Sequence, residues 1–271
     1  MQANPITGRV LIVAGSDSGG GAGIQADIKA VSALNAFAMT AIAALTAQNT
    51  TGVYGVVPVD PAFVALQMRV VLEDLGADSI KIGMLANAAV IEAVAGEYEE
   101  RAINVPLIVD PVMVAKSGHF LLEPDAVQTL RKRLLPHAEV VIPNLPEAEA
   151  LTDIPVRNLD DMRRAAEMIR TFGPKAVLLK GGHLEDERLC DLLLTEDGEE
   201  VFEGRRVHTP HTHGTGCTMA SAIAAGIAQG MTVRDSVARA RAYVEQAIRT
   251  APGFGHGHGP LNHLHTVRPF P

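Results

Sequence analysis

Short apolar runs alternate with segments of helical periodicity along most of this chain. The runs that predict buried strands lie at residues 10–14, 79–82, 107–110, 140–142 and 176–179. The segments that predict helices lie at residues 24–34, 61–75, 88–101, 125–135 and 160–172. Near-continuous apolar strands that alternate with helices are typical of a parallel sheet covered on both faces. We therefore predict an α/β fold with a mainly parallel central sheet.

The last third of the chain departs from this alternation. Residues 189–207 place an acidic turn between two apolar runs, which predicts a hairpin that adds antiparallel strands at one edge of the sheet. The segment 218–229 is small and apolar on every side, so we expect a buried helix there. Residues 233–249 carry Arg and Glu on one face and predict an outer helix. No linker-like stretch divides the chain, which we interpret as one domain over residues 1–271.

Composition and charge narrow the kind of molecule. Hydrophobic residues make up 47% of the 271 residues, so the chain can bury a sizeable core without a disulfide or a metal. Its 23 Lys and Arg against 31 Asp and Glu give a net charge of −8, which disfavours nucleic acid as a partner. No uncharged apolar run approaches the roughly 18 residues that a membrane span needs. With two cysteines only, we expect a cytoplasmic protein without a membrane segment.

The turn His213-Gly214-Thr215-Gly216-Cys217 directly precedes the expected buried helix. A helix N-terminus offers free backbone N–H groups and the positive end of the dipole, and glycines let a phosphate approach them. Such a cradle suits phosphoryl transfer, in which charge builds on the transferred group. Cys217 would lie in the first helical turn, where the dipole lowers a thiol pKa, and would take the proton from a substrate hydroxyl. Taken alone, the turn fits an ordinary glycine-rich loop equally well.

A second glycine-rich loop, residues 15–23, follows the first strand and opens a helix. Its consecutive glycines do not match a dinucleotide-binding fingerprint, and no Gly-Lys-Ser/Thr follows as in a P-loop. A loop that lets a flat substrate approach the backbone fits better. Asp27, in the following helix, fits a solvated helix carboxylate. Gln48 carries the donor and acceptor groups that an aminopyrimidine requires, but without more context it fits a loop residue that caps backbone groups.

Three polar residues follow predicted strands on the later part of the chain. Asp110 ends one strand, Glu147 lies just beyond another, and Lys180 ends a third. Ligands in α/β proteins bind at the carboxyl ends of the strands. Mg²⁺ needs only one or two carboxylates, with waters and phosphates completing its shell, so Asp110 and Glu147 are the candidate metal ligands. A lysine at the position of Lys180 can neutralise phosphate charge during transfer.

Ordered sequence blocks across nearly the whole chain carry a family likeness. The blocks are Ala14-Gly15-Ser16-Asp17, Gly20-Gly21-Ala22-Gly23-Ile24-Gln25-Ala26-Asp27, Ala47-Gln48-Asn49-Thr50, Lys81-Ile82-Gly83-Met84-Leu85, Pro143-Asn144-Leu145-Pro146-Glu147, Lys180-Gly181-Gly182-His183, His211-Thr212-His213-Gly214-Thr215-Gly216-Cys217 and Gly257-His258-Gly259-Pro260. With these blocks in order, the chain resembles the hydroxymethylpyrimidine/phosphomethylpyrimidine kinases of thiamine biosynthesis, in the ribokinase-like superfamily.

The resemblance implies a ribokinase-like three-layer α/β/α sandwich, with a mainly parallel central sheet and antiparallel edge strands, and a homodimer. It implies the use of ATP and Mg²⁺ and two successive phosphorylations, first of 4-amino-5-hydroxymethyl-2-methylpyrimidine and then of its monophosphate. A pyridoxal kinase on the same scaffold is the nearest alternative, because both substrates are hydroxymethyl-bearing aza-aromatic rings. A ligand sensor that has lost catalysis is disfavoured, because Cys217, Lys180 and the glycine turn are all present.

The resemblance also assigns roles to individual residues. Those that match the family's substrate pocket are Gly15, Ala22, Asp27, Gln48 and Met84. Those expected at the ATP and its phosphates are Asn144, Lys180, Thr215 and His213, with Gly214 and Gly216 in the catalytic turn. His211 is expected to line the phosphate site beside His213. Cys217 stands where most ribokinase relatives have an aspartate base, which separates the pyrimidine-type kinases from the sugar kinases.

Four histidines cluster near the end of the chain, at positions 256, 258, 263 and 265. Two His-x-His pairs are compatible with a transition metal. No cysteine or acidic residue lies nearby to complete such a site, and Gly257-His258-Gly259-Pro260 belongs to the family pattern. We therefore expect an ordered tail that packs near the active site.

Overall fold

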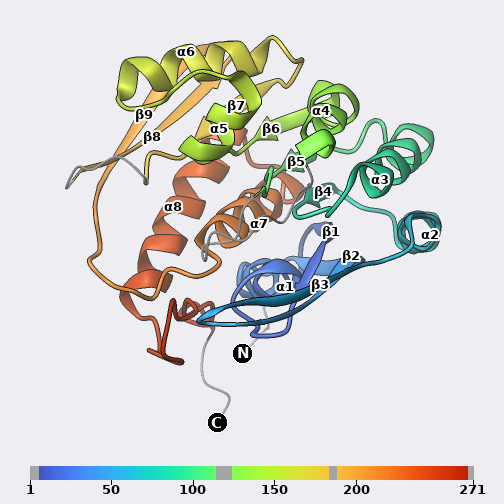
Figure 1. Ribbon diagram of the computed structural model, residues 1–271, viewed down its shortest axis with the longest axis horizontal. Helices are drawn as coiled ribbons and strands as arrows, with labels where there is room; N and C mark the ends of the chain where they lie inside the picture. The colour runs from blue at the N-terminus through green and yellow to red at the C-terminus, as the bar shows by residue number, and fades with distance from the viewer. Residues whose placement is uncertain (1–5, 114–123, 183–187, 268–271) are drawn as a thin grey trace.

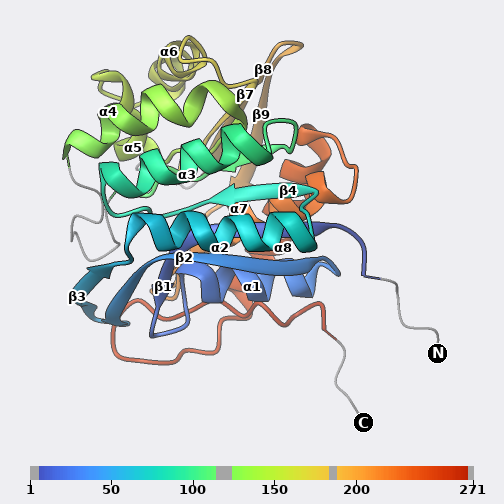
Figure 2. The same cartoon turned by 90° about the vertical axis from the view of Figure 1, so that its right-hand side faces the viewer.

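The computed structural model describes residues 6–113, 124–182 and 188–267, which form one nine-stranded sheet between two layers of helices (Figure 1, Figure 2). The strand order in the sheet is β3-β2-β1-β4-β5-β6-β7-β8-β9. The strands are β1 (Arg9–Asp17), β2 (Phe37–Asn49), β3 (Gly52–Pro58), β4 (Ser79–Ile82), β5 (Leu107–Val109), β6 (Ala138–Val141), β7 (Ala176–Leu179), β8 (Arg188–Thr195) and β9 (Gly198–Arg205). Strands β2, β1 and β4 to β7 run parallel, which confirms the predicted sheet.

Antiparallel strands close the sheet at both edges. The β8–β9 hairpin pairs with β7, as the acidic turn near residue 197 predicts. The strand β3 pairs with β2 at the opposite edge, and this second antiparallel edge is absent from the sequence-based expectation. The tight β2–β3 turn forms because the Asn49 carboxamide oxygen accepts hydrogen bonds from the backbone N–H groups of Thr51 and Gly52.

The helices divide between the two faces of the sheet. One face is covered by α2 (Pro61–Asp74), α3 (Ala88–Arg101), α4 (Pro124–Arg133), α5 (Leu145–Thr152) and α6 (Leu159–Arg170), and the 3-10 turn η1 (Leu135–His137) follows α4. The other face is covered by α1 (Gly23–Ala33), α7 (Thr215–Ala228) and α8 (Val233–Arg249). Figure 2 shows the sheet edge-on between α2 and α3 on one side and α1 on the other.

Strand β1 shows why the apolar runs have no polar alternation. Leu11 and Val13 are completely buried against the α2–α6 layer, while Val10 and Ile12 are completely buried against α1, α7 and α8. Successive side chains of a strand point to opposite faces, so a strand covered on both sides must be apolar throughout. The three-layer arrangement follows directly from these runs.

Helix α7 is buried around nearly its whole circumference, as its composition predicts. It lies between the sheet and α8, where the Ser79 hydroxyl donates to the Ala224 carbonyl. A side chain at Gly226 would come within 2.5 Å of the Ser236 hydroxyl, so the close α7–α8 crossing requires a very small residue there. This packing fixes the N-terminus of α7 beside the carboxyl ends of the parallel strands (Figure 1). In the part of the chain that the structure describes, no helix combines the length and apolarity needed to cross a membrane.

Candidate active site

A cavity of about 1190 Å³ lies at the carboxyl ends of the parallel strands. Its volume exceeds the roughly 300–1,000 Å³ of a typical small-ligand pocket, so it has room for two substrates. The lining residues include Gly15, Asp17, Ala22, Gln48, Lys81, Met84, Asp110, Asn144, Glu147, Lys180, His213, Gly214, Thr215, Gly216 and Cys217. The cavity therefore brings together both glycine loops and the polar strand ends, and it includes all the site residues expected from the sequence except Asp27 and His211.

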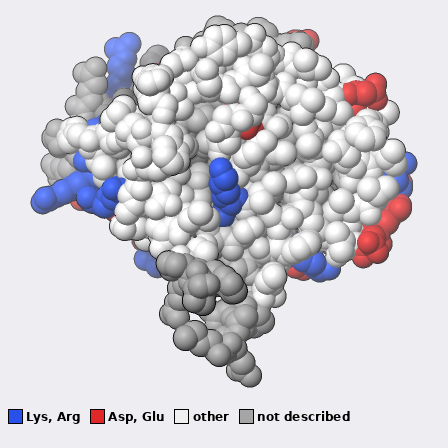
Figure 3. All heavy atoms as spheres, turned by 90° about the horizontal axis from the view of Figure 1, so that it is seen from below, with Lys and Arg blue, Asp and Glu red and all other residues white. Residues whose placement is uncertain are grey.

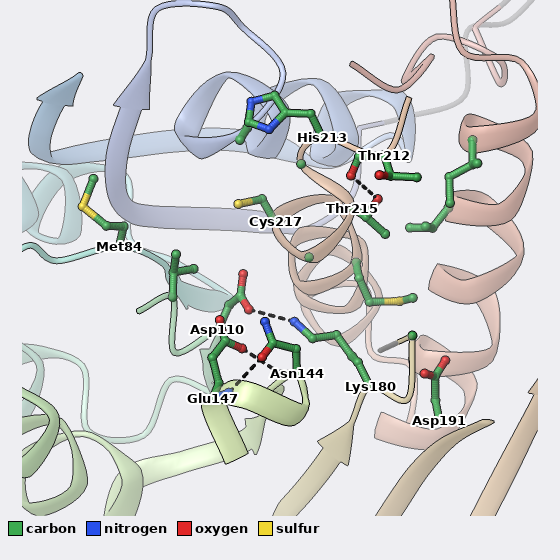
Figure 4. Close-up of a pocket in the computed structure, with 18 of the residues that line it drawn as sticks. Met84, Asp110, Asn144, Glu147, Lys180, Asp191, Thr212, His213, Thr215 and Cys217 are labelled. Atoms are coloured by element: carbon green, nitrogen blue, oxygen red, sulfur yellow. Dashed lines mark hydrogen bonds and ion pairs between the residues drawn. The ribbon is translucent and has the colours of Figure 1, made fainter. Parts of the chain in front are cut away.

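Three of the polar side chains come from the loops that follow β5, β6 and β7. The Lys180 ammonium lies 3.1 Å from the Asp110 carboxylate, and Figure 4 shows the two side chains pointing toward one another. Asn144 is the N-cap of α5 and forms a reciprocal capping box with Glu147, in which each side chain accepts the other's backbone N–H. A backbone bridge joins Asn144 to Lys180. These bonds hold the polar side chains at fixed positions on one wall of the cavity.

The two acids of this wall have the chemistry of a magnesium site. The second Asp110 carboxylate oxygen is buried and has no hydrogen-bond partner among the residues that the structure describes. Burial raises the pKa of Glu147 to about 7, with Asp110 acting in the same direction and Lys180 opposing it. The described residues contain no cluster of three or more His, Cys, Asp or Glu side chains that would hold a metal without help. Two carboxyl groups and an orphaned oxygen fit Mg²⁺, which takes most of its shell from water and phosphate.

The glycine turn before α7 has a left-handed backbone conformation that favours glycine. Gly214 is the N-cap of α7 with φ of +80°, and a Cβ there would lie 1.8 Å from the Gly21 carbonyl oxygen. No side chain caps the helix, so its first N–H groups stay available to an anion. A Cβ on Gly216 would lie 3.2 Å from the Lys180 ammonium, which places that cation directly over the turn. The two glycine loops therefore touch through their backbones, and a phosphoryl group can lie between Lys180 and the helix N-terminus.

Cys217 lies in the first turn of α7 and points into the cavity (Figure 4). Burial raises the pKa of its thiol to about 12, while Lys81 and the Gly23 backbone N–H act to lower it and Asp27 and Asp110 act to raise it. The sequence-based expectation of a lowered thiol pKa is therefore wrong in this protein, because burial outweighs the helix dipole. At neutral pH the thiol is protonated when no substrate is bound.

The acceptor end of the cavity is formed by the first glycine loop and by β2. A Cβ on Gly15 would lie 2.5 Å from the terminal carbon of Met84, so the two residues pack as one surface. The Gln48 carboxamide oxygen accepts a hydrogen bond from Thr46, and its nitrogen lies 3.3 Å from the His213 ring. Ala22, which is the N-cap of α1, lines the same end of the cavity. A flat polar ring can lie against the loop with Gln48 at its edge.

Asp17 organises this end of the site, and the sequence analysis gave it no role. Its carboxylate accepts hydrogen bonds from the backbone N–H groups of Gly19, Gly21 and Ala22. It also lies 2.9 Å from the His213 ring nitrogen. Burial raises the pKa of Asp17, but the hydrogen bonds from His213 and Ala22 outweigh it and the net pKa is lowered. A signal that could have pointed to Asp17 is its place at the last residue of β1, within the first glycine loop.

Three residues lie elsewhere than we expected, and one of them, His211, does not line the cavity. His213 contacts Asp17 and Gln48 at the acceptor end, whereas we had placed it beside the ATP with Asn144 and Lys180. Asp27 is completely buried and does not line the cavity, since its carboxylate pairs with Lys81 behind the wall. The sequence alone gave no sign of either arrangement, because each depends on a partner far along the chain.

The family model described as phosphomethylpyrimidine kinase matches residues 17–262 of this chain. The chain belongs to this kinase family. The match confirms the family that the sequence blocks predict, and it spans residues 17–23 of the first glycine loop, the whole turn before α7 and every residue of the polar wall. His183, the last residue of the block that starts at Lys180, lies outside the described residues.

The chain is similar to two curated relatives and to one solved structure. It is 48% identical over 260 residues to the thiamine biosynthesis bifunctional protein of Geobacter sulfurreducens, a match that covers 95% of this chain and 52% of that protein. It is 46% identical over 259 residues to the hydroxymethylpyrimidine/phosphomethylpyrimidine kinase of Bacillus subtilis, covering 94% of each. An ADP complex of Bacillus subtilis pyridoxal kinase superposes with a TM-score of 0.87 at 34% identity, covering 95% of this chain and 98% of that chain. The three-layer fold is ribokinase-like, as predicted.

The histidine-rich tail of this kinase packs against the active-site helix. His263 is buried, and its ring lies 2.9 Å from the hydroxyl of Thr218, the residue after Cys217. Tyr243 of α8 donates to the His263 carbonyl oxygen, and His258 donates its backbone N–H to the Thr50 carbonyl. The tail thus contacts α7, α8 and the β2–β3 turn, as expected for an ordered segment near the site.

Acidification is expected to destabilise this kinase through His263. Burial lowers the pKa of His263 to about 4, with Lys29 and His265 acting in the same direction. Its folded pKa therefore lies below the unfolded value near 6.5, so its stabilisation is present above about pH 6.5 and lost as the pH falls toward 4. The full loss is about 3 kcal/mol. Urea unfolding at pH 7 and pH 4.5 should show a smaller pH-dependent loss for His263→Gln than for the native chain; identical losses would contradict the assignment.

Proposed function

We propose that this chain is an ATP-dependent kinase of thiamine biosynthesis, which phosphorylates 4-amino-5-hydroxymethyl-2-methylpyrimidine and then its monophosphate to the diphosphate. One observation carries the proposal: a single cavity joins the glycine loop at the acceptor end, the uncapped N-terminus of α7 and the polar wall with Lys180. An acceptor ring, a transferred phosphoryl group and a nucleotide each need one of these three parts. The names of the relatives supply the acceptor ring.

In the proposed first step, the pyrimidine lies against the first glycine loop with Gln48 at its polar edge. The Cys217 thiol first releases its own proton to solvent. The hydroxymethyl oxygen then attacks the γ-phosphorus of ATP, the bond to the leaving ADP oxygen breaks, and the Cys217 thiolate takes the hydroxyl proton to become a thiol again. Lys180 and the backbone N–H groups of residues 215–217 stabilise the charge on the phosphoryl oxygens. Asp110 and Glu147 would hold Mg²⁺, which neutralises phosphate charge when bound.

The second step differs in its acceptor. The attacking group is now a phosphate oxygen, which is already ionised at neutral pH. No proton has to leave, so Cys217 matters less in this step. The wide cavity suits an acceptor that carries its own phosphate, because the longer substrate still has to place its oxygen between the acceptor end and the N-terminus of α7.

Pyridoxal kinase is the alternative function, because the fold is similar to that of the pyridoxal kinase named above. A coupled ADP-release assay with hydroxymethylpyrimidine, its monophosphate and pyridoxal in parallel separates the two. We expect turnover of both pyrimidines, and a lower kcat/KM for pyridoxal than for either pyrimidine. Turnover of pyridoxal alone would reject the pyrimidine as substrate and leave the site assignments standing. We also propose a cytoplasmic location, as the cysteine count leads us to expect.

A homodimer that uses the β2–β3 hairpin is part of the proposal. Tyr54 and Val57 of β3 are 71% and 63% exposed, and Leu45 of β2 is 50% exposed. Figure 3 shows that the face around this hairpin and α1 carries few charged side chains. Exposed apolar residues that cluster in this way are typical of an interface. Light scattering should give twice the chain mass for the native protein and the single mass for Val57→Asp, while Ile103→Asp, outside the hairpin, should leave the dimer intact. A native monomer would reject the interface.

A further inference from the structure

A completely buried ion pair joins Lys81 of the cavity lining to Asp27, and the proposed mechanism gives it no task. The Lys81 ammonium is 3.0 Å from each carboxylate oxygen of Asp27, and both side chains have no exposed surface. Removing two charges from water is costly, and a buried pair is seldom more stable than a well-packed apolar pair. A role beyond stability would account for its presence under the catalytic turn.

Two packed helices place this ion pair one turn below Cys217. The Gly23 backbone N–H at the start of α1 donates to the Cys217 sulfur. The Ser221 hydroxyl on α7 donates to an Asp27 oxygen at 2.7 Å. Asp27 follows Gly23 by four residues, and Ser221 follows Cys217 by four residues. The two contacts therefore lie about one helical turn apart, between the same faces of α1 and α7. Asp27 is therefore fixed directly beneath the thiol.

Lys81 reaches the same place from the sheet. It stands on β4, which lies beside β1 in the sheet. The side chains of Lys81 and Cys217 both line the cavity. A Cβ on Gly83 would lie 2.9 Å from the Lys81 ammonium, so the glycine of this strand end leaves the space that the ammonium occupies. The charges that act on the thiol come from β4, from α1 and from the two strand ends that carry Asp110 and Lys180.

We propose that Lys81 sets the charge state of Cys217, and that Asp27 is the positioning residue that holds Lys81 beneath the thiol. This inference rests on the proposed function only in taking Cys217 as the proton acceptor. Lys81 stabilises the thiolate that accepts the proton, and Asp27 partly offsets Lys81, which keeps the thiol from ionising permanently. Lys81 keeps its charge, because Asp27, Cys217 and Asp110 raise its pKa despite its burial. Burial raises the pKa of Asp27, and Lys81 and Ser221 oppose that rise.

The two charges have opposite effects on the thiol, and this makes the inference testable without any substrate. The rate at which iodoacetamide alkylates Cys217 follows its thiolate fraction and can be measured on the Cys217 peptide by mass spectrometry. At pH 8, Asp27→Asn should speed alkylation at least about tenfold, and Lys81→Met should slow it at least about tenfold, one pKa unit each. Ser221→Ala is the matched control, because it removes a contact to Asp27 and leaves every charge in place; we expect a change below about threefold.

The sign of the change separates the inference from simple loss of structure. A partly unfolded variant exposes an ordinary thiol, so its alkylation speeds up whichever residue is replaced. Slower alkylation in Lys81→Met together with faster alkylation in Asp27→Asn would support the inference. Shifts in the same direction, or no shift in either variant, would overturn it. Kinase assays on pyrimidine and pyridoxal are separate, so failure of the proposed substrate would leave the alkylation result unaffected.

Discussion

Replacement of Cys217 by alanine should slow the first phosphorylation by about 10²–10⁴-fold, the range that a general base contributes, and slow the second much less. The thiol points into the cavity from the first turn of α7, next to the N–H groups that receive the phosphoryl group. The first acceptor is a hydroxyl that must lose a proton, whereas the second is an ionised phosphate. Single-turnover rates with hydroxymethylpyrimidine and with its monophosphate measure the two steps separately.

Cys217→Ser is the control for this experiment. A serine hydroxyl keeps the size and the hydrogen bond from Gly23 but does not ionise near neutral pH, so it should behave like alanine in the first step. Because the thiol pKa is raised to about 12, the rate of the first step should also climb with pH across the neutral and mildly alkaline range. Equal losses in both steps, or full activity in the serine variant, would leave Cys217 as a residue that only shapes the turn.

Replacement of Gly214 by alanine should lower kcat/KM for both phosphorylations at least about a hundredfold, since displacement of a reacting group by about 1 Å can cost this much. Gly214 has φ of +80°, and an added Cβ would lie 1.8 Å from the Gly21 carbonyl oxygen. The clash is with backbone, so relief requires one glycine loop to move away from the other. That movement separates the acceptor from the N-terminus of α7, and it affects both steps equally.

Gly96→Ala is the matched control for the turn. Gly96 lies within α3, and a Cβ there would have no atom within 4 Å, so the substitution should be neutral or slightly stabilising. Thermal unfolding of both variants distinguishes a displaced loop from a protein that fails to fold. A Gly214→Ala variant that folds and retains native kcat/KM would show that contact between the two loops is unnecessary for transfer.

Much of the fold was predictable because its signals are local. The apolar runs of β1, β5 and β7 have no polar alternation, and burial on both faces of a parallel sheet suits them. Small apolar residues on every side of α7 likewise predict a helix that is buried between two layers. The β3 edge was missed, since its pairing with β2 depends on an Asn49-capped turn and not on a long apolar run.

The sequence predicted which residues form the site better than it predicted which of them contact one another. Gln48, Asn144, Lys180 and Cys217 line one cavity, as their positions after strands and loops suggest. The roles of Asp17 and His213 were not visible, because they meet from opposite ends of the chain at 2.9 Å. The same holds for Asp27, whose partner Lys81 is fifty-four positions away.

The sequence by itself determined which layers this kinase forms and which turn opens its buried helix, because apolar periodicity and glycine placement act over a few neighbouring residues. Only the tertiary structure decided the charge state of the residues at that turn. Burial raises the thiol pKa of Cys217 against the helix dipole, and Lys81 and Asp27 act on it in opposite directions from beneath. Desolvation and charge interactions depend on distances through space, and these exist only once α1, α7 and β4 have packed together.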